Sequence, residues 1–452
     1  MGKNLIRKVF NGDGTWVCPA GVTRVRVFAG LRGFPHIAGN GAEAAIALNL
    51  DGAAYTWGAN MAGIQGRGDG SAVTGVASSP TAVIGGLYFR QASLGSAAVA
   101  IDLTGSAYAW GSNVFGQLGV GDVTARSSPV AVIGGLTFRQ VAAANNHVLG
   151  VRSDGNPYAW GSNVNGQLGL GDVVARSSPV AVLGGLKFVS VIGSGANSSY
   201  GLTQDGALYA WGNNANGQLG LGGVIPRSSP VAVLGGLKFR TVAANGSAGA
   251  NGSVYAITPN GTLYAWGQND FGQLGDGTVT PRSSPVAVLG GLKFRTVAAS
   301  GRSAIALSTV GTAYAWGRNT NGQLGVGDVV ARSSPVAVLG GLSFVEVAMG
   351  DTTSYGTATT GFSYGWGYNF TGQAGYGGSG NAASSPLLVV GGIKFQAVAE
   401  TDLNSVAMDV TPGQSYPVSV FAAVVAFGGR GIYQSPYGNA AMPTKVTLEY
   451  EG

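Results

Sequence analysis

The sequence predicts an all-β protein: a seven-bladed β-propeller plus a small β-sandwich built from both chain termini. Three observations lead to this prediction. The tetrapeptide Tyr-x-Trp-Gly recurs seven times at nearly constant spacing. Each interval contains four short β-prone stretches separated by turn signals, and none has a helical period long enough for a helix. Residues 1–30 and 411–452 do not match the repeat and carry strand patterns of their own.

The repeat unit is clearest from Phe138 to Phe188. Its four β-prone stretches are Phe138–Ala142, His147–Val151, Tyr158–Trp160 and Val180–Leu183. Asp154-Gly155 lies between the second and third stretches, and this dipeptide is a strong hairpin signal. The chain holds 80 glycines without a strict period of three, which is typical of many tight turns. A lone four-stranded sheet would leave its apolar faces in water, whereas blades stacked in a ring bury them.

The recurring tryptophans are predicted to pack between neighbouring blades. Burying an indole removes roughly 150–250 Å² from water. At about 25 cal/mol per Å², this gives a gross gain of about 4–6 kcal/mol per blade. A ligand-binding stack is the alternative, but recurrence in phase with the repeat favours core packing. The predicted blade-core residues are Trp57, Trp110, Trp160, Trp211, Trp266, Trp316 and Trp366.

Composition limits the chemistry that the chain can support. Cys18 is the only cysteine, and His36 and His147 are the only histidines, so we expect neither an intramolecular disulfide nor a zinc site of the usual kind. The net charge of +6 weakly favours an acidic partner, and a mildly basic solvated surface is the alternative. The longest apolar run, Val420–Phe427, is too short to span a bilayer. The start of the chain does not resemble a signal peptide, so we expect a soluble product with no membrane insertion.

No catalytic constellation is evident, so we expect no enzymatic activity, no cofactor and no metal. His147 is predicted to be a structural residue because no nucleophile signature accompanies it. The recurring aspartates of the Gly-Asp turns suit turn chemistry, since one carboxylate per loop is too few for calcium; they are Asp122, Asp172 and Asp328. A polysaccharide depolymerase would need paired carboxylates. The glutamates at positions 43, 346 and 400 form no such pair in the sequence.

Five arginines occupy the same repeat position, just before Ser-Ser-Pro. Because a ring turns equal repeat positions into a circle on one face, we define these residues as the basic rim: Arg126, Arg176, Arg227, Arg282 and Arg332. The hypothesis is that this rim meets an acidic glycan, a lipopolysaccharide phosphate or an acidic protein surface. Solvation and simple copying of the repeat is the alternative. A second arginine series follows the first Phe of the unit, at Arg90, Arg139, Arg240 and Arg295.

The pattern Tyr-x-Trp-Gly-x-Asn-x-x-Gly-Gln-Leu-Gly, as in Tyr158 to Gly169, resembles the repeat of the regulator of chromosome condensation family. The resemblance spans about Phe34 to Val410 and implies a seven-bladed propeller. The first repeat departs from the pattern with Gly63-Ile64-Gln65-Gly66, and the seventh departs with Gly372-Gln373-Ala374-Gly375. The half-unit that precedes Tyr-x-Trp-Gly occurs eight times if 34–50 and 395–410 both count. We hypothesise that one terminal copy closes the ring by pairing N- and C-terminal strands, and that the other packs as a surplus hairpin.

The two ends are predicted to form one terminal β domain, with residues 1–30 and 411–452 as its halves and the propeller, residues 31–410, inserted between them. Each end alone is too short to make a core. Ring closure brings the propeller's entry and exit together, so such an insertion is geometrically easy. Residues Thr15 to Thr23 with the following alternating strand, and the ending from Tyr416, resemble glycine-rich domains of bacteriophage tail-fibre and appendage proteins.

Together these features favour a non-enzymatic virion structural or fibre protein whose propeller binds the host cell surface or another virion protein. The expected location is the virion, in a tail or surface appendage. The expected partners are other virion proteins, a host surface glycan or protein, and further copies of the chain, with no specific nucleic acid. The alternative is a nucleotide-exchange factor or chromatin-binding propeller, which the repeat resemblance alone suggests; fold-level analogy is a weak basis for function.

Overall fold

A computed structural model describes most of the propeller and several strands of the chain ends. The described residues are 5–10, 14–17, 24–29, 37–39, 44–48, 52–69, 76–245, 252–360, 362–369, 374, 382–388, 406–409, 415–418 and 446–451. Strands dominate the described residues, and the one helical element among them is a short 3-10 turn, η1 (Met61–Gly63). No helix among the described residues is long and apolar enough to cross a membrane.

Seven four-stranded antiparallel sheets, which we number as blades one to seven, follow one another along the chain. Blade one comprises β4 (Ile37–Gly39), β5 (Ala44–Leu48), β6 (Ala54–Ala59) and β7 (Val76–Ala82). Blade two comprises β8 (Phe89–Leu94), β9 (Ala97–Asp102), β10 (Ala107–Gly111) and β11 (Arg126–Ala131). Blade three comprises β12 (Phe138–Ala143), β13 (His147–Arg152), β14 (Pro157–Gly161) and β15 (Arg176–Ala181). Blade four comprises β16 (Ser190–Ser194), β17 (Ser198–Leu202), β18 (Leu208–Gly212) and β19 (Arg227–Ala232).

The last three blades repeat the same order. Blade five comprises β20 (Thr241–Ala244), β21 (Ser253–Ile257), β22 (Leu263–Gly267) and β23 (Arg282–Ala287). Blade six comprises β24 (Phe294–Ser300), β25 (Ser303–Ser308), β26 (Ala313–Gly317) and β27 (Arg332–Ala337). Blade seven comprises β28 (Phe344–Met349), β29 (Thr353–Ala358), β30 (Ser363–Gly367) and β31 (Ala383–Leu388). The predicted all-β class and the seven blades are therefore confirmed.

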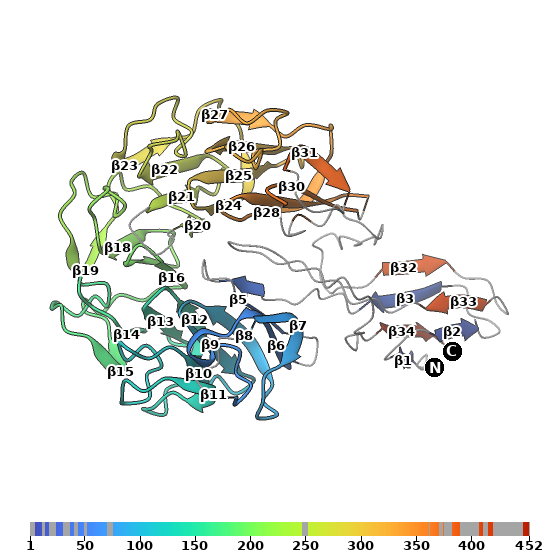
Figure 1. The fold of residues 1–452 in the computed structure, drawn as a ribbon, viewed down its shortest axis with the longest axis horizontal. Helices are drawn as coiled ribbons and strands as arrows, with labels where there is room; N and C mark the ends of the chain where they lie inside the picture. Colours follow the sequence, from blue (N-terminus) through green and yellow to red (C-terminus); the bar gives the residue numbers. More distant parts are fainter. Residues whose placement is uncertain are drawn as a thin grey trace.

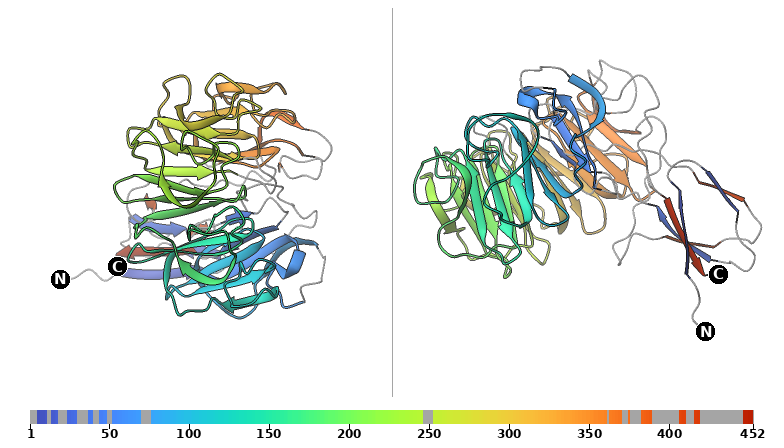
Figure 2. Two further views of the ribbon diagram at one scale, coloured as in Figure 1. Left: turned by 90° about the vertical axis from the view of Figure 1, so that its left-hand side faces the viewer. Right: turned by 90° about the horizontal axis from the view of Figure 1, so that it is seen from below.

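The first strand of each blade lies innermost and the fourth lies outermost, as Figure 1 shows. First strands of neighbouring blades contact one another, for example β8 with β12 and β20 with β24. Side views show the sheets stacked face to face around the axis (Figure 2). The pairing between third and fourth strands shifts register, as between Ala159 and Gly161 in blade three. Ser-Ser-Pro lies in this irregular stretch of the outer strand, where an edge strand tolerates proline.

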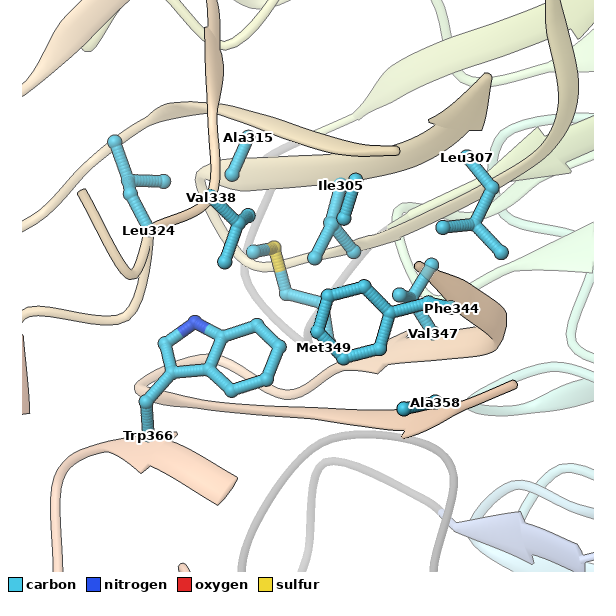
Figure 3. Packing of buried hydrophobic residues seen from close by; sticks show 11 residues of the cluster. Ile305, Leu307, Ala315, Leu324, Val338, Phe344, Val347, Met349, Ala358 and Trp366 are labelled. Carbon is cyan, nitrogen blue, oxygen red and sulfur yellow. The ribbon is translucent and has the colours of Figure 1, made fainter. Parts of the chain in front are cut away.

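The core lies between the blades. Figure 3 shows the packing between blades six and seven, where Trp366 and Phe344 meet Leu324 and Val338. The rings of Phe344 and Trp366 are 6.1 Å apart and tilted by 44°. Six of the seven repeat tryptophans are fully buried, from Trp110 to Trp366. The backbone of Trp57 pairs with Ala45 in blade one, and its side chain lies outside the described part of the structure.

Strands from the two chain ends pair with one another beside the ring (Figure 1). A four-stranded sheet has the order β1 (Leu5–Phe10), β34 (Val446–Glu451), β3 (Arg24–Ala29) and β32 (Val406–Asp409). A second sheet joins β2 (Gly14–Val17) to β33 (Ser415–Val418). Both sheets therefore combine N-terminal with C-terminal strands, as the sequence predicts for the terminal domain.

The hypothesis for ring closure needs correction. Each of the seven blades takes its four strands from one continuous segment, so no blade among the described residues pairs N- with C-terminal strands. The described part of the surplus half-unit, β32, does not pair with the propeller, because it pairs with β3 from Arg24 to Val27; residues 395–405 lie outside the described residues. This pairing makes β32 the outer strand of the terminal sheet, next to β3. The end of the predicted propeller range, residues 406–409, thus lies in the terminal sheet.

Candidate binding surfaces of the propeller

The recurring motif residues hold the blades and their loops together. The indole Nε1 of Trp160 donates to the carbonyl oxygen of Gln117 in the preceding blade at 3.0 Å. The buried side chain of Asn163 accepts from the Leu168 N–H at 2.9 Å and donates to the Asp172 carbonyl at 3.0 Å. Such buried polar groups are retained because their hydrogen bonds are satisfied. The motif residues therefore hold together the loop between the third and fourth strands of a blade. We call this loop the motif loop.

The atypical first repeat keeps the same closing contact. Its motif loop has Ile64 where the other blades have Gln, yet the indole of Trp110 still donates to the carbonyl oxygen at that position, at 2.9 Å. The contact uses the backbone, so it tolerates the change of side chain.

The arginines of the basic rim begin the outermost strands, and four of the five are paired with an aspartate of their own motif loop. Arg126–Asp122 and Arg176–Asp172 are both 2.6 Å, Arg332–Asp328 is 2.5 Å and Arg282–Asp276 is 2.7 Å. The same aspartates make the expected turn bonds, such as Asp172 Oδ1 accepting from the Val174 N–H at 3.0 Å. That N–H and the Arg176 guanidinium lower the pKa of Asp172. Pairing of this kind leaves little net charge at these four positions.

Arg227 is the exception on the rim. Gly223 occupies the position that carries aspartate in blades two, three and six. The Arg227 guanidinium donates a 3.4 Å hydrogen bond to the neighbouring Pro226 carbonyl. Val224 and Ile225 beside it are 57% and 64% exposed. Blade four therefore presents a cation that has no carboxylate partner among the described residues, next to exposed aliphatic side chains.

The second arginine series links adjacent blades near the central axis. Arg139 donates to the Phe188 carbonyl at 2.8 Å, and Arg295 donates to the Phe344 carbonyl at 2.8 Å. Arg240 reaches the Phe294 carbonyl at 2.9 Å, and Arg90 reaches the next blade in the same way. These arginines are structural cross-links between inner strands.

His147 lies between blades three and four and is completely buried. Its Nε2 is 2.9 Å from Ser199 Oγ on β17, and Ser199 Oγ donates to the Gln167 carbonyl at 2.7 Å. Because the hydroxyl proton is already used, Nε2 must carry the imidazole proton. Nδ1 has no hydrogen-bond partner among the described residues. Burial lowers the pKa of His147 to about 4.

One cluster was missed by the sequence reasoning. The guanidinium of Arg302 lies 4.9 Å from the ring centroid of Phe271, and that of Arg318 lies 5.9 Å from it. Phe271 belongs to the motif loop of blade five, Arg302 to the turn between β24 and β25, and Arg318 follows β26. We call these three residues the Phe–Arg patch. The sequence did contain a signal for this patch. Arg302 and Arg318 depart from the repeat, because neither position carries a basic residue in the other well-matched units.

Five segments of the chain match the family model named "Regulator of chromosome condensation (RCC1) repeat": 104–151, 154–202, 205–254, 260–307 and 310–355. A second model of the same repeat matches residues 138–167, 189–218 and 294–323. The ultraviolet-B receptor UVR8 of Arabidopsis thaliana is 28% identical over 244 residues, covering 53% of this chain and 54% of the receptor. The probable E3 ubiquitin-protein ligase HERC3 of Homo sapiens is 39% identical over 90 residues, covering 19% of this chain and 8% of the ligase. The chain thus spans about half the length of the first relative and under a tenth of the second.

Solved structures show the same fold. Prp20p from Saccharomyces cerevisiae has a TM-score of 0.58 and 23% identity, covering 76% of this chain and 87% of Prp20p. Human WBSCR16 has a TM-score of 0.62 and 20% identity, covering 88% of this chain and 98% of WBSCR16. At these identities the likeness concerns the fold alone.

Proposed function

Because this chain belongs to the family of proteins with regulator of chromosome condensation (RCC1) repeats, we propose that its propeller is a rigid, non-enzymatic platform for a protein partner. The observation that carries the proposal is that the polar residues recurring in every repeat make structural contacts within the propeller. The motif Asn, Gln and Trp positions close loops and join blades, as in Asn163 and Trp160. Several residues that depart from the repeat, such as Gly223, Arg302 and Arg318, lie on the loops, which is where rigid scaffolds present their recognition groups.

The first candidate is a partner of the kind that Prp20p binds. Prp20p has binding properties toward Gsp1p and histones. We infer a nucleotide-exchange factor or chromatin-binding propeller on that basis. The test is biolayer interferometry of the full chain against Gsp1p and against core histones, with Prp20p as the positive control, together with release of a fluorescent GDP from Gsp1p. Saturable binding of either protein supports this candidate, and binding of neither, where Prp20p binds, rejects it.

The second candidate is a virion appendage protein that binds the host surface or other virion proteins. Several copies of this protein would be present in each particle. The pairing of both chain ends in shared sheets favours it, since the propeller is then an insertion carried by a separate β domain. The motif from Thr15 to Thr23 supports the same assignment. Immunogold electron microscopy of purified particles tests it. Label on particle surfaces supports it, and label on chromatin with none on particles rejects it.

Under the second candidate the basic rim would contact an acidic glycan or protein. Four rim arginines already have aspartate partners, so Arg227 would contribute most of the attraction. Arg227→Glu is therefore expected to weaken attachment more than Arg176→Glu does. Equal attachment by wild type and by Arg227→Glu would contradict a role of the basic rim in binding.

A further inference from the structure

We propose that the Phe–Arg patch is a docking site for a short acidic peptide segment of a protein partner. The site rests on the proposed function of the propeller as a protein-binding platform and names the surface and the chemistry of the partner. It lies where the motif loop of blade five meets the inner turn and the motif loop of blade six.

The fold does not require the two arginines. At the position of Arg302, blades two, three, four and seven carry Ser96, Asn146, Asn197 and Thr352. At the position of Arg318, the same blades carry Ser112, Ser162, Asn213 and Tyr368. These blades have the same strands and the same buried tryptophan. Packing therefore leaves the presence of two adjacent arginines on blade six unexplained.

The hydrogen-bonding capacity of the patch is almost unused. Two guanidinium groups offer ten N–H donors. Of these, the Arg318 Nε–H donates to Thr320 Oγ1 at 3.0 Å. Neither arginine has an ion pair with a carboxylate among the described residues. This contrasts with Arg176, which is paired with aspartate, and with Arg295, which binds carbonyl groups of the next blade.

The Phe271 ring organises the two cations. A guanidinium over an aromatic face is attracted by the ring quadrupole, so each group is held in place before a ligand arrives. Each planar fork matches one carboxylate in bidentate geometry. Arginine and aromatic side chains are also the residue types that dominate binding energy at protein interfaces. The patch thus combines two guanidinium groups with the aromatic ring that holds them.

The surrounding charge favours a short acidic segment over a continuous polyanion. Asp270 is the neighbour of Phe271 in the chain, and Asp351 on blade seven lies against Gly301, next to Arg302. These carboxylates confine the positive charge to two residues. A nucleic-acid backbone, which carries a phosphate at every step, would meet repulsion on both sides. A peptide with only two carboxylates would place less negative charge near these aspartates.

The experiment is fluorescence anisotropy with the full chain in low salt and a fluorescein-labelled peptide, Gly-Ser-Glu-Gly-Glu-Ser-Gly, which carries only two glutamates. We expect saturable binding that Arg302→Ala/Arg318→Ala weakens at least tenfold. The matched control, Arg126→Ala/Arg332→Ala, removes the same charge from the rim and is expected to change the affinity less than twofold. Arg302→Lys/Arg318→Lys keeps the charge but loses the fork, and we expect an intermediate loss. Thermal melts of each variant verify folding.

Three outcomes would overturn the site: no binding by wild type, equal weakening by the rim control, or tighter binding of an octathymidine oligonucleotide than of the peptide. The proposed function is tested separately by Gsp1p and histone binding of the same variants. Partner binding that survives in Arg302→Ala/Arg318→Ala overturns the site alone, because the platform still works through another surface.

Discussion

His147 makes the stability of the junction between blades three and four depend on pH. In the folded protein its neutral imidazole donates from Nε2 to Ser199, and Nδ1 faces buried surroundings without a partner. Protonation would add a charge and a second donor at a fully buried site where no acceptor among the described residues faces Nδ1. Burying an unpaired charge is strongly unfavourable. Acid is therefore expected to open this junction.

The magnitude follows from linkage between protonation and folding. The pKa of His147 is about 4 in the folded protein, against an ordinary value of 6.5. One pKa unit corresponds to about 1.4 kcal/mol, so the difference amounts to about 3 kcal/mol. Because the folded-state pKa is lowered, the unfolded chain takes up the proton first as pH falls. The stability is fully present above about pH 6.5 and is lost as pH falls from there to about 4.

The assay can be direct because the chain has only two histidines. NMR of a histidine-labelled sample, with His36→Gln to assign the two signals, should show no titration of His147 above about pH 5. Urea unfolding from pH 7.5 to 4 should show that wild type and His36→Gln lose about 3 kcal/mol more than His147→Gln does. The difference between wild type and His147→Gln cancels the carboxylates common to both.

Titration of the His147 signal near pH 6.5 would refute this reasoning. So would a stability difference between wild type and His147→Gln that stays constant from pH 7.5 to 4. Either result would mean that the imidazole is solvated in the folded protein.

Three further predictions test the packing and the rim. Trp160→Ala should destabilise the protein by about 3–5 kcal/mol in urea unfolding, because it removes a fully buried indole and its hydrogen bond to blade two; a loss under 1 kcal/mol would contradict inter-blade packing. Gly166→Ala should lower the melting temperature measured by calorimetry, because its φ is +78° and a Cβ would lie 2.5 Å from Ser228 Cα; an unchanged melting temperature would contradict that close approach. Gly223→Asp should restore the missing partner of Arg227 and stabilise by up to about 1 kcal/mol, since a Cβ there meets nothing within 4 Å; destabilisation in the same melts would count against the pairing.

Local patterns predicted the architecture because the forces that select it repeat along the chain. The spaced tryptophans, the Asp-Gly turns and the four apolar stretches per unit each specify one blade, and one blade needs only its neighbours. The structural role expected for His147 also follows from its isolation in the sequence. The identity of its partner, Ser199, does not, because 52 residues separate the two side chains.

Side-chain pairing on the surface was not predictable in the same way. The basic rim was inferred from arginines alone, although Asp122, Asp172 and Asp328 each precede a rim arginine by four residues. In an irregular loop, a spacing of four residues brings the two charges together only if the loop folds back on itself. The motif Asn stabilises this folded-back conformation through its hydrogen bond to the aspartate carbonyl. Arg227 lacks the aspartate partner of the equivalent arginines because Gly223 stands at the aspartate position. The sequence shows this glycine, but its effect becomes clear only once the arginine–aspartate pairing is known.

The number of blades, their strand content and their buried tryptophans depend on contacts between adjacent units, so a periodic sequence is enough to specify them. The pairing of the chain ends depends instead on residues far apart in the sequence, since β32 joins β3 across more than 370 residues. That contact has no period to reveal it, because it arises only when the stacked sheets bring the two ends of the chain together. The Phe–Arg patch joins adjacent blades, but it depends on two arginines that depart from the repeat, and only the tertiary structure shows that both lie over the Phe271 ring.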